Sequence, residues 1–238
     1  MIEYIVPENI DDRILSRSAK LLAQGALIAI PTDTSWGVVC SFQSKEGIKR
    51  LRRLSGEREE RHFTLLCANI SQFQEFCSLD NSRFRLINRL SPGPYTFILK
   101  THLGTEKALG LRRSELGVRI PDHPVPLALV RTLGIPLYSI TAKRSMLRDD
   151  DSGENAAENR DSHGLLVNGP LVNGSSIREL PPIPEEELFE GGWELEELEE
   201  ISMILDPGED QIRTFSTILD LSGDEVNLVR QGAGPWPY

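Results

Sequence analysis

The stretch ALIAIPTDTSWG, residues 26–37, decides the fold that this sequence predicts. Its first five residues are apolar and predict a buried strand, which Pro31 ends. The residues that follow place hydroxyls, a carboxylate, an aromatic ring and a glycine in one bend at the end of that strand, where ligands of α/β proteins collect. The residues alone leave a second interpretation equally open, a capped turn in which Asp33 and Thr34 satisfy their own backbone.

Helix and strand patterns alternate on both sides of this bend. Helical spacing and capping residues predict helices at residues 12–24, 44–54, 71–77, 81–90 and 124–133. Further strands are expected at residues 63–67, 95–100, 116–120, 136–141, 201–205, 216–221 and 226–230. Residues 185–200 predict a surface helix interrupted near Gly191 and Gly192. Strands that alternate with helices predict an α/β fold, a twisted mixed sheet of the α+β kind packed with helices.

Length and composition fit one large domain that spans residues 1–238. The chain has 238 residues, of which 39% are hydrophobic and 26% charged, and it shows no internal repeat. Between residues 144 and 184 the periodicity gives way to consecutive aspartates, glycines, asparagines and paired prolines. This composition predicts a loop or lid inserted within the domain, and we expect the strands after it to complete the same sheet.

Several classes of protein are disfavoured by the composition. No apolar run approaches the roughly 20 residues of a membrane helix. The first nine residues carry Glu3 and Glu8 but no basic residue, unlike a secretory signal, so we expect a cytoplasmic protein without a membrane partner. The three cysteines lack C-x-x-C spacing and predict buried thiols rather than a disulfide framework or a zinc site. The histidines also lack ligand spacing, and His123 is expected to cap a helix, so no metal site is predicted.

Charge is unevenly distributed along the chain. The formal net charge of −10 argues against a protein that binds nucleic acid by bulk attraction. Basic residues nevertheless concentrate at positions 45–61 and acidic residues at positions 185–200. This asymmetry predicts a local basic face.

Five ordered elements of the chain resemble the motifs of the YrdC/YciO superfamily. Residues 31–37 resemble its Pro-Thr-Asp-Thr-x-Tyr-Gly signature, with Trp36 in the position of the tyrosine. The other four are residues 91–96, 117–124, 216–220 and 230–234, which resemble Pro-Gly-x-x-Thr, Val-Arg-x-Pro-x-His-Pro, Ser-Thr-x-x-Asp and Arg-x-Gly. Residues 62–67 and 95–100 are most similar to the YciO branch. Because the elements occur in order and span nearly all of the chain outside residues 144–184, the resemblance implies a YrdC/RibB-like fold.

The resemblance implies an activity like that of the threonylcarbamoyl-AMP synthases. YrdC-type members make threonylcarbamoyl-AMP, an intermediate of a tRNA modification, from L-threonine, bicarbonate and ATP. A threonine carbamate would attack the α-phosphate of ATP, with Mg²⁺ bound to the nucleotide. This step depends on the alignment of the reactants and on positive charge placed where negative charge builds up around the phosphorus. Members have also been described as binding double-stranded RNA. Two alternatives therefore stay open: a module that binds double-stranded RNA or tRNA without adenylation activity, and an acyl-adenylate hydrolase.

The resemblance also implies which residues bind the substrates. Those expected at the amino acid are Thr32, Thr34, Arg119, Ser139, Thr141 and Thr217. We expect Arg119 to grip the threonine carboxylate with its guanidinium fork, although a strand-end arginine could instead pair with a surface carboxylate. Ser139 and Thr141 alternate on a strand and should face the same side, as a polar ligand surface requires, although the same hydroxyls could equally satisfy a buried polar gap.

Four cationic side chains are expected to bind the nucleotide: Arg53, Arg58, Lys143 and Arg230. Of these, Arg58 and Lys143 are the catalytic candidates. Gly56 stands where the family has a lysine, so Arg58 or Arg53 would replace that lysine at the phosphates. Alternatively, these basic residues form only the solvated face of a helix. Lys143 replaces an asparagine and would neutralise a phosphate or abolish the usual geometry. Residues 232–234 are expected to be a flexible stretch that folds over the nucleotide.

Overall fold

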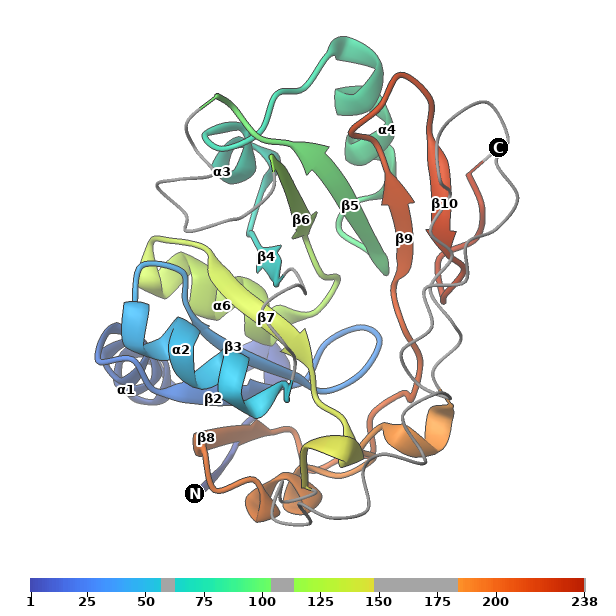
Figure 1. Cartoon of the computed structure of the whole chain (residues 1–238). Helices are drawn as coiled ribbons and strands as arrows, with labels where there is room; N and C mark the ends of the chain where they lie inside the picture. Colours follow the sequence, from blue (N-terminus) through green and yellow to red (C-terminus); the bar gives the residue numbers. More distant parts are fainter. Residues whose placement is uncertain (57–62, 104–113, 148–183, 238) are drawn as a thin grey trace, which may run out of the picture.

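The computed structural model describes residues 1–56, 63–103, 114–147 and 184–237. In these residues ten strands form one sheet, in the order β1-β8-β2-β3-β7-β4-β6-β5-β9-β10 (Figure 1). The strands are β1 (Ile2–Tyr4), β2 (Leu27–Ile30), β3 (Gly37–Ser41), β4 (Thr64–Leu66), β5 (Tyr95–Lys100), β6 (Glu115–Arg119), β7 (Leu137–Thr141), β8 (Ile201–Asp206), β9 (Thr217–Asp220) and β10 (Asn227–Arg230). Parallel and antiparallel pairs both occur, so the predicted mixed sheet is confirmed.

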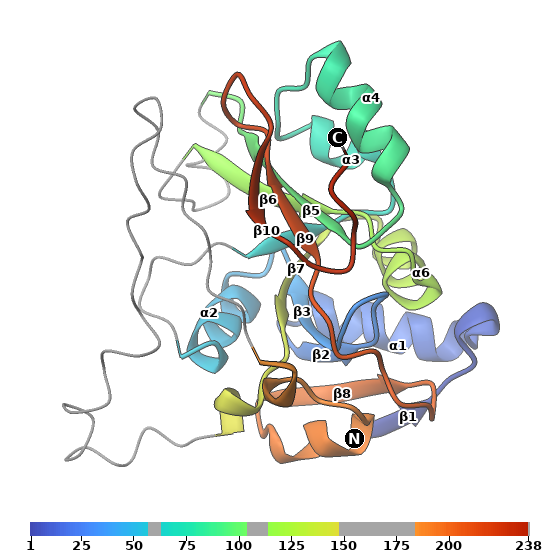
Figure 2. The ribbon, with the colours of Figure 1, turned by 90° about the vertical axis from the view of Figure 1, so that its right-hand side faces the viewer.

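In Figure 1 the helices α1 (Asp12–Ala23), α2 (Lys45–Leu54) and α6 (Pro124–Leu133) lie around the lower half of this sheet. The helices α3 (Ile70–Gln74) and α4 (Asn81–Leu90) lie beside its upper half. Along β2 the side chains alternate between two hydrophobic cores, as the period of a strand requires. Leu27 and Ala29 join the larger core with residues of α2, α3 and α4, whereas Ile28 and Ile30 join the smaller core with residues of α1 and α6. Figure 2 shows α2 on one side of β2 and β3 and α1 and α6 on the other.

Local capping explains why the helices begin and end where the sequence predicts. The side chains of Asp11 and Ser44 accept hydrogen bonds from backbone N–H groups in the first turns of α1 and α2. His123 caps α6 in the same way, through Nδ1, which confirms the predicted capping role. Gly134 ends α6 with a φ of 75°, a conformation that other residues rarely adopt.

The structure differs from the prediction at three places. Strands β1 and β3 were not expected, because β1 is short and β3 begins at a glycine. Residues 185–200 do not form an interrupted surface helix. They form two short 3-10 helices, η3 (Glu185–Glu187) and η4 (Gly192–Glu197), because Leu188, Phe189 and Leu195 turn inward and are buried.

Strands β8, β9 and β10 follow the predicted insertion in sequence and join the same sheet as the strands before it. At the start of the predicted insertion, a 3-10 helix, η2 (Arg144–Leu147), ends the described part. Residues 148–183 lie outside the described residues, so the division into one domain with an inserted lid stays a prediction. None of the helices in the described ranges has the length and apolar character that crossing a membrane requires.

Candidate functional site

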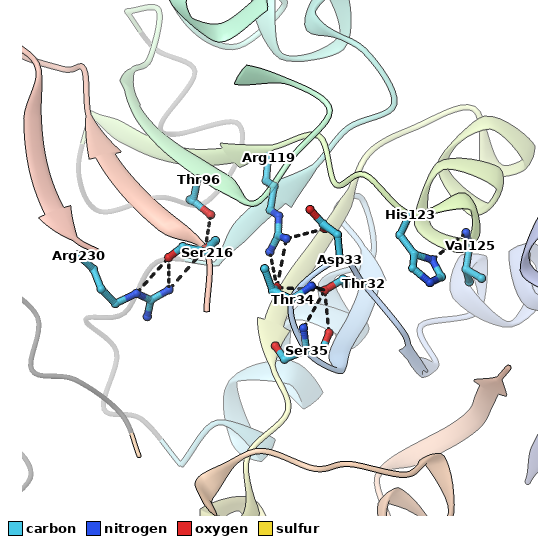
Figure 3. A network of polar contacts seen from close by, with 10 residues as sticks. All are labelled: Thr32, Asp33, Thr34, Ser35, Thr96, Arg119, His123, Val125, Ser216 and Arg230. Atoms are coloured by element: carbon cyan, nitrogen blue, oxygen red, sulfur yellow. Dashed lines mark hydrogen bonds and ion pairs between the residues drawn. The ribbon is translucent and has the colours of Figure 1, made fainter. Parts of the chain in front are cut away.

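The bend that follows β2 is held from inside by one hydroxyl group. Thr32 Oγ1 donates to the carbonyl of Ser35 at 2.7 Å and accepts from the backbone N–H groups of Thr34 and Ser35, both at 3.2 Å. Thr32 therefore caps the turn, and the side chains of Asp33 and Thr34 do not. Both side chains point toward the end of β6 (Figure 3), and Thr34 Oγ1 also lies 3.2 Å from Thr32 Oγ1, within hydrogen-bond distance.

Arg119, the last residue of β6, meets them with its guanidinium group. Its Nη2 donates to Asp33 Oδ1 at 2.6 Å, and both Nη1 and Nη2 donate to Thr34 Oγ1 at 3.1 Å. The ion pair is nearly enclosed, with side-chain exposures of 9% for Arg119 and 12% for Asp33. Arg119 is thus neither a solvated strand-end arginine nor the partner of a surface carboxylate. It links the turn after β2 to the distant strand β6.

This ion pair is not saturated with hydrogen bonds. Arg119 Nε and Asp33 Oδ2 are buried and lack a hydrogen-bond partner among the described residues. Burial lowers the pKa of Arg119, and the carboxylate of Asp33 opposes that effect. A buried donor and a buried acceptor without partners are costly, and a catalytic role or a bound water, ion or ligand would explain them.

A line of small and hydroxylated residues continues from the turn across the sheet. Ser139 of β7 lies opposite Thr64 of β4, which lies opposite Gly117 of β6, so all three share one face. A Cβ built at Gly117 would lie 3.7 Å from Thr64 Oγ1 and 3.8 Å from Thr96 Cγ2, which places Thr96 of β5 on the same face.

The same line reaches back to the turn through another glycine. A Cβ built at Gly37 would lie 3.4 Å from Ser139 Oγ and 3.7 Å from Thr32 Cγ2. Thr141 is paired with Gly37 and shares the face of Ser139, as the alternation along the strand predicts. The two glycines leave the sheet surface uncovered by side chains of their own, and hydroxyl groups surround it.

A second guanidinium group lies at the far side of this surface. Arg230, the last residue of β10, donates from Nε and Nη2 to the carbonyl of Ser216, at 3.2 and 3.0 Å, and stacks over the ring of Phe215. Ser216 Oγ in turn hydrogen-bonds Thr96 Oγ1 at 2.9 Å (Figure 3). Burial lowers the pKa of Arg230 to about 10, and the positive charge of Arg119 adds to that shift. The two arginines therefore repel one another across the site.

The structure brings most of the predicted amino-acid-binding residues together, and it places one of the predicted cations, Arg53, in a surface ion pair. Thr32, Thr34, Arg119, Ser139 and Thr141 surround the turn, as described above. Arg53, at the end of α2, forms an exposed ion pair with Glu200. Lys143 follows β7 and forms an isolated β-bridge with Leu188. Arg58 lies outside the described residues, so its role stays a prediction.

Thr217 and the C-terminal tail are arranged differently from the prediction. Thr217 is fully buried, its hydroxyl donates to the carbonyl of Gly234, and it accepts from the N–H of Gly232 at 2.9 Å. A Cβ built at Gly232 would lie 2.2 Å from Phe215 O. The prediction of a flexible glycine stretch is therefore wrong: these glycines permit close packing, and hydrogen bonds hold the tail in place.

The family to which the chain belongs follows from a comparison of sequences. The family model for the Sua5/YciO/YrdC domain, described as telomere recombination, matches residues 20–181. The chain belongs to this family. That result confirms the resemblance inferred from the motifs.

Individual relatives in the Sua5/YciO/YrdC family agree with this assignment. The chain is 33% identical over 137 residues to the uncharacterized protein YciO of Escherichia coli, covering 57% of the chain and 66% of YciO. It is 28% identical over 158 residues to the threonylcarbamoyl-AMP synthase of Mus musculus, covering 66% of the chain and 56% of the synthase. The matched region thus spans somewhat less than two thirds of these curated relatives.

Solved structures of the Sua5/YciO/YrdC family confirm the predicted fold. The crystal structure of E. coli YciO matches with a TM-score of 0.71 at 26% identity, over 99% of this chain and 97% of YciO. The structure of P. abyssi Sua5 complexed with L-threonine matches with a TM-score of 0.71 at 20% identity, over 98% of this chain and 57% of Sua5. Because the identity to P. abyssi Sua5 is only 20%, this second match shows the fold alone.

Sequence reasoning missed four residues of this sheet face: Asp33, Thr64, Thr96 and Ser216. Asp33, Thr96 and Ser216 stand in stretches that resemble family motifs, but their partners are more than 80 residues away and only the fold brings them together. Thr64 is identified only by the strand register. Among the described residues, no group of three or more His, Cys, Asp or Glu side chains could hold a metal ion.

Proposed function

We propose that this chain binds L-threonine and ATP on the hydroxyl-lined sheet face and makes threonylcarbamoyl-AMP with bicarbonate, as a cytoplasmic protein of tRNA modification. The observation that carries the proposal is the buried Arg119, which Asp33 and Thr34 hold beside this face. Its positive charge also contributes to the lowered pKa of the second guanidinium group, that of Arg230. The sequence likeness to threonylcarbamoyl-AMP synthases supports the same reaction.

The amino acid would bind at the turn. Arg119 presents an unpartnered Nε donor that suits a carboxylate oxygen. Thr34 Oγ1 already touches Arg119 and would lie beside that carboxylate. Ser139 and Thr141 supply further hydroxyls on the adjoining strand.

The nucleotide would extend from this point across the sheet toward Arg230. A triphosphate there would relieve the repulsion between Arg230 and Arg119. Arg53, Arg58 and Lys143 remain candidates for further phosphate contacts. Mg²⁺ would arrive with the nucleotide and reduce the negative charge on the phosphates, since the described residues contain no acidic cluster that would hold the ion alone.

The reaction needs alignment rather than a protein acid or base. A carbamate oxygen of N-carboxythreonine would form a bond to the α-phosphorus of ATP, and the bond from that phosphorus to the bridging oxygen of pyrophosphate would break. Charge builds up on the phosphoryl oxygens during this exchange, and fixed guanidinium groups stabilise it.

Pyrophosphate release by the purified full chain tests the proposal. We expect release that requires both threonine and bicarbonate, and a loss of about 100-fold or more in kcat/KM for Arg119→Lys, which keeps the charge but loses the fork. Arg131→Lys, at an exposed position on α6, is the matched control and should behave like the unchanged chain. Absence of pyrophosphate release, while a threonylcarbamoyl-AMP synthase is active in the same assay, would refute the synthase activity.

A specific observation also favours double-stranded RNA or tRNA as a ligand. Lys45, Lys49, Arg52 and Arg53 are exposed on α2, although Arg53 is paired with Glu200. Phosphate-driven binding should weaken steeply as salt rises. Replacing Lys49 and Arg52 with glutamine should weaken RNA binding, whereas Lys20→Gln on α1 should not. Binding that is absent at low salt, or equal in the variants, would exclude this function.

A further inference from the structure

The turn that carries Thr34 is held from outside by a polar network whose other members, Arg144, Glu190, Glu194 and residues 211–214, lie in none of the sequence motifs. Its centre is the backbone carbonyl of Glu190, which accepts from the indole N–H of Trp36 at 3.2 Å and from the N–H of Gln211 at 2.8 Å. Trp36 lies at one end of the turn. Gln211 begins a short segment, residues 211–214, which we call the strap.

The strap leads directly back to the substrate-binding end of the turn. The N–H of Thr214 donates to the carbonyl of Thr34 at 3.0 Å. An ion pair between Arg213 and the side chain of Glu190, at 3.6 Å, holds the strap a second time. The position of Glu190 therefore affects both Trp36 and Thr34, the residues on either side of Ser35.

One buried carboxylate fixes the position of Glu190. Glu194 Oε1 accepts from the N–H of Glu190 at 2.8 Å and from the N–H of Gly191 at 3.0 Å. Its other oxygen pairs with Arg144, whose guanidinium also stacks over Phe189. Glu194 is only 7% exposed, so both oxygens are committed to this arrangement.

Arg144 stands before the segment 148–183 in sequence and Glu194 stands after it, so this ion pair joins the two described ends of the chain there. The β-bridge between Lys143 and Leu188 lies beside it. On the side of Arg144, the N–H of Ala142 donates to the carbonyl of Trp36 at 2.9 Å. Both members of the ion pair are thus connected to Trp36 by separate short paths.

We propose that Arg144 and Glu194 are positioning residues for the turn that carries Thr34, acting through the Glu190 carbonyl and the strap. Neither touches the surface proposed for the substrates. They would determine how closely Thr34 approaches Arg119, and an error of about 1 Å in such a site can cost on the order of 100-fold in rate. The consequence for threonine rests on the function proposed above, whereas the consequence for the turn does not.

Hydrogen exchange in the full chain tests the structural part. Glu194→Gln should speed the exchange of the Trp36 indole N–H and of the Gln211 and Thr214 amides by about 10-fold or more, which corresponds to one lost hydrogen bond. Arg144→Met should do the same, and Arg144→Lys should restore much of the protection. Glu197→Gln, at an exposed position of η4, is the matched control.

Threonine affinity, measured by calorimetry on the same variants, tests the functional part. We expect weaker threonine binding in Glu194→Gln and Arg144→Met, with ATP binding changed much less, a difference that general destabilisation would not produce. Unchanged exchange at the turn, or exchange raised equally in α1 and α6, would overturn the inference. If one variant does not fold, the other decides. If the unchanged chain does not bind threonine, the proposed function fails and the exchange result alone decides the positioning role.

Discussion

Replacement of Arg119 by methionine should destabilise the fold strongly. The side chain is 9% exposed, its ion pair with Asp33 is 2.6 Å long, and it donates two hydrogen bonds to Thr34. Methionine fills similar volume but leaves the Asp33 carboxylate buried without its cation. Breaking one partner of a buried pair costs about 3–5 kcal/mol.

A double-mutant cycle separates the charge from the packing. Asp33→Asn leaves the charge of Arg119 uncompensated and should cost about 2–4 kcal/mol. Once both charges are gone, no buried charge remains to be compensated, so the cost of the double variant should be well below the sum of the single costs. We expect a coupling free energy of about 2 kcal/mol or more.

Urea unfolding, followed by near-ultraviolet circular dichroism, measures the three free energies. In a chain of this size, the single change at Arg119 should also lower Tm by on the order of 10 °C. Two results would contradict the reasoning: a loss below about 1 kcal/mol for Arg119→Met, or additive effects of the two changes. Either would mean that Asp33 and Arg119 do not depend on each other in solution.

Three further predictions concern other parts of the fold. Burial lowers the pKa of His123, so the neutral imidazole contributes fully to stability above pH 6.5, and this contribution is lost as the pH falls toward the pKa in the folded state. The free energy of unfolding in urea should therefore fall over this pH range in the unchanged chain, and should fall less in His123→Asn. Gly232→Ala should cost about 2 kcal/mol or more in urea unfolding, because its Cβ would meet Phe215 O at 2.2 Å, whereas Gly223→Ala, with nothing within 4 Å, should change stability by less than about 0.5 kcal/mol. The three cysteines are buried, so a thiol reagent should label them only as urea unfolds the chain, and rapid labelling of the native protein would show that the core opens.

Sequence predicted the elements whose signals are local. The capping side chains of Asp11 and Ser44 lie within three residues of the N–H groups that they satisfy, so the starts of α1 and α2 follow from adjacent residues. Glutamates favour helix at residues 185–200, but the burial of Leu188 and Phe189 against the rest of the chain decided the outcome there. That burial depends on tertiary structure, which local propensity does not contain.

The candidate site was predictable in part for the same reason. Thr34 and Arg119 were expected to share a site because of the motifs, but the choice of Thr217 instead of Ser216 required knowledge of which way β9 faces. Adjacent residues of a strand point to opposite faces. Thr217 is paired with Tyr95 and turns toward the tail, whereas Ser216 reaches Thr96 on the face of the site. A shift of one residue along the strand therefore separates a hydroxyl that holds the tail, that of Thr217, from one that faces the candidate site, that of Ser216.

The charge balance of the sheet face is consistent with the anionic ligands proposed for it. Asp33 compensates Arg119, but among the described residues no carboxylate pairs with Arg230, which donates only to oxygens of Ser216. The pKa of Arg230, lowered to about 10, shows that folding works against its charge. An anion bound between the two guanidinium groups would remove that penalty, and at about 100 times its Kd it would stabilise the fold by roughly 2.7 kcal/mol. A carboxylate would suit the donor left free on Arg119, and a phosphate beside Arg230 would offset the charge that burial disfavours there, which is what the proposed pair of threonine and nucleotide would supply.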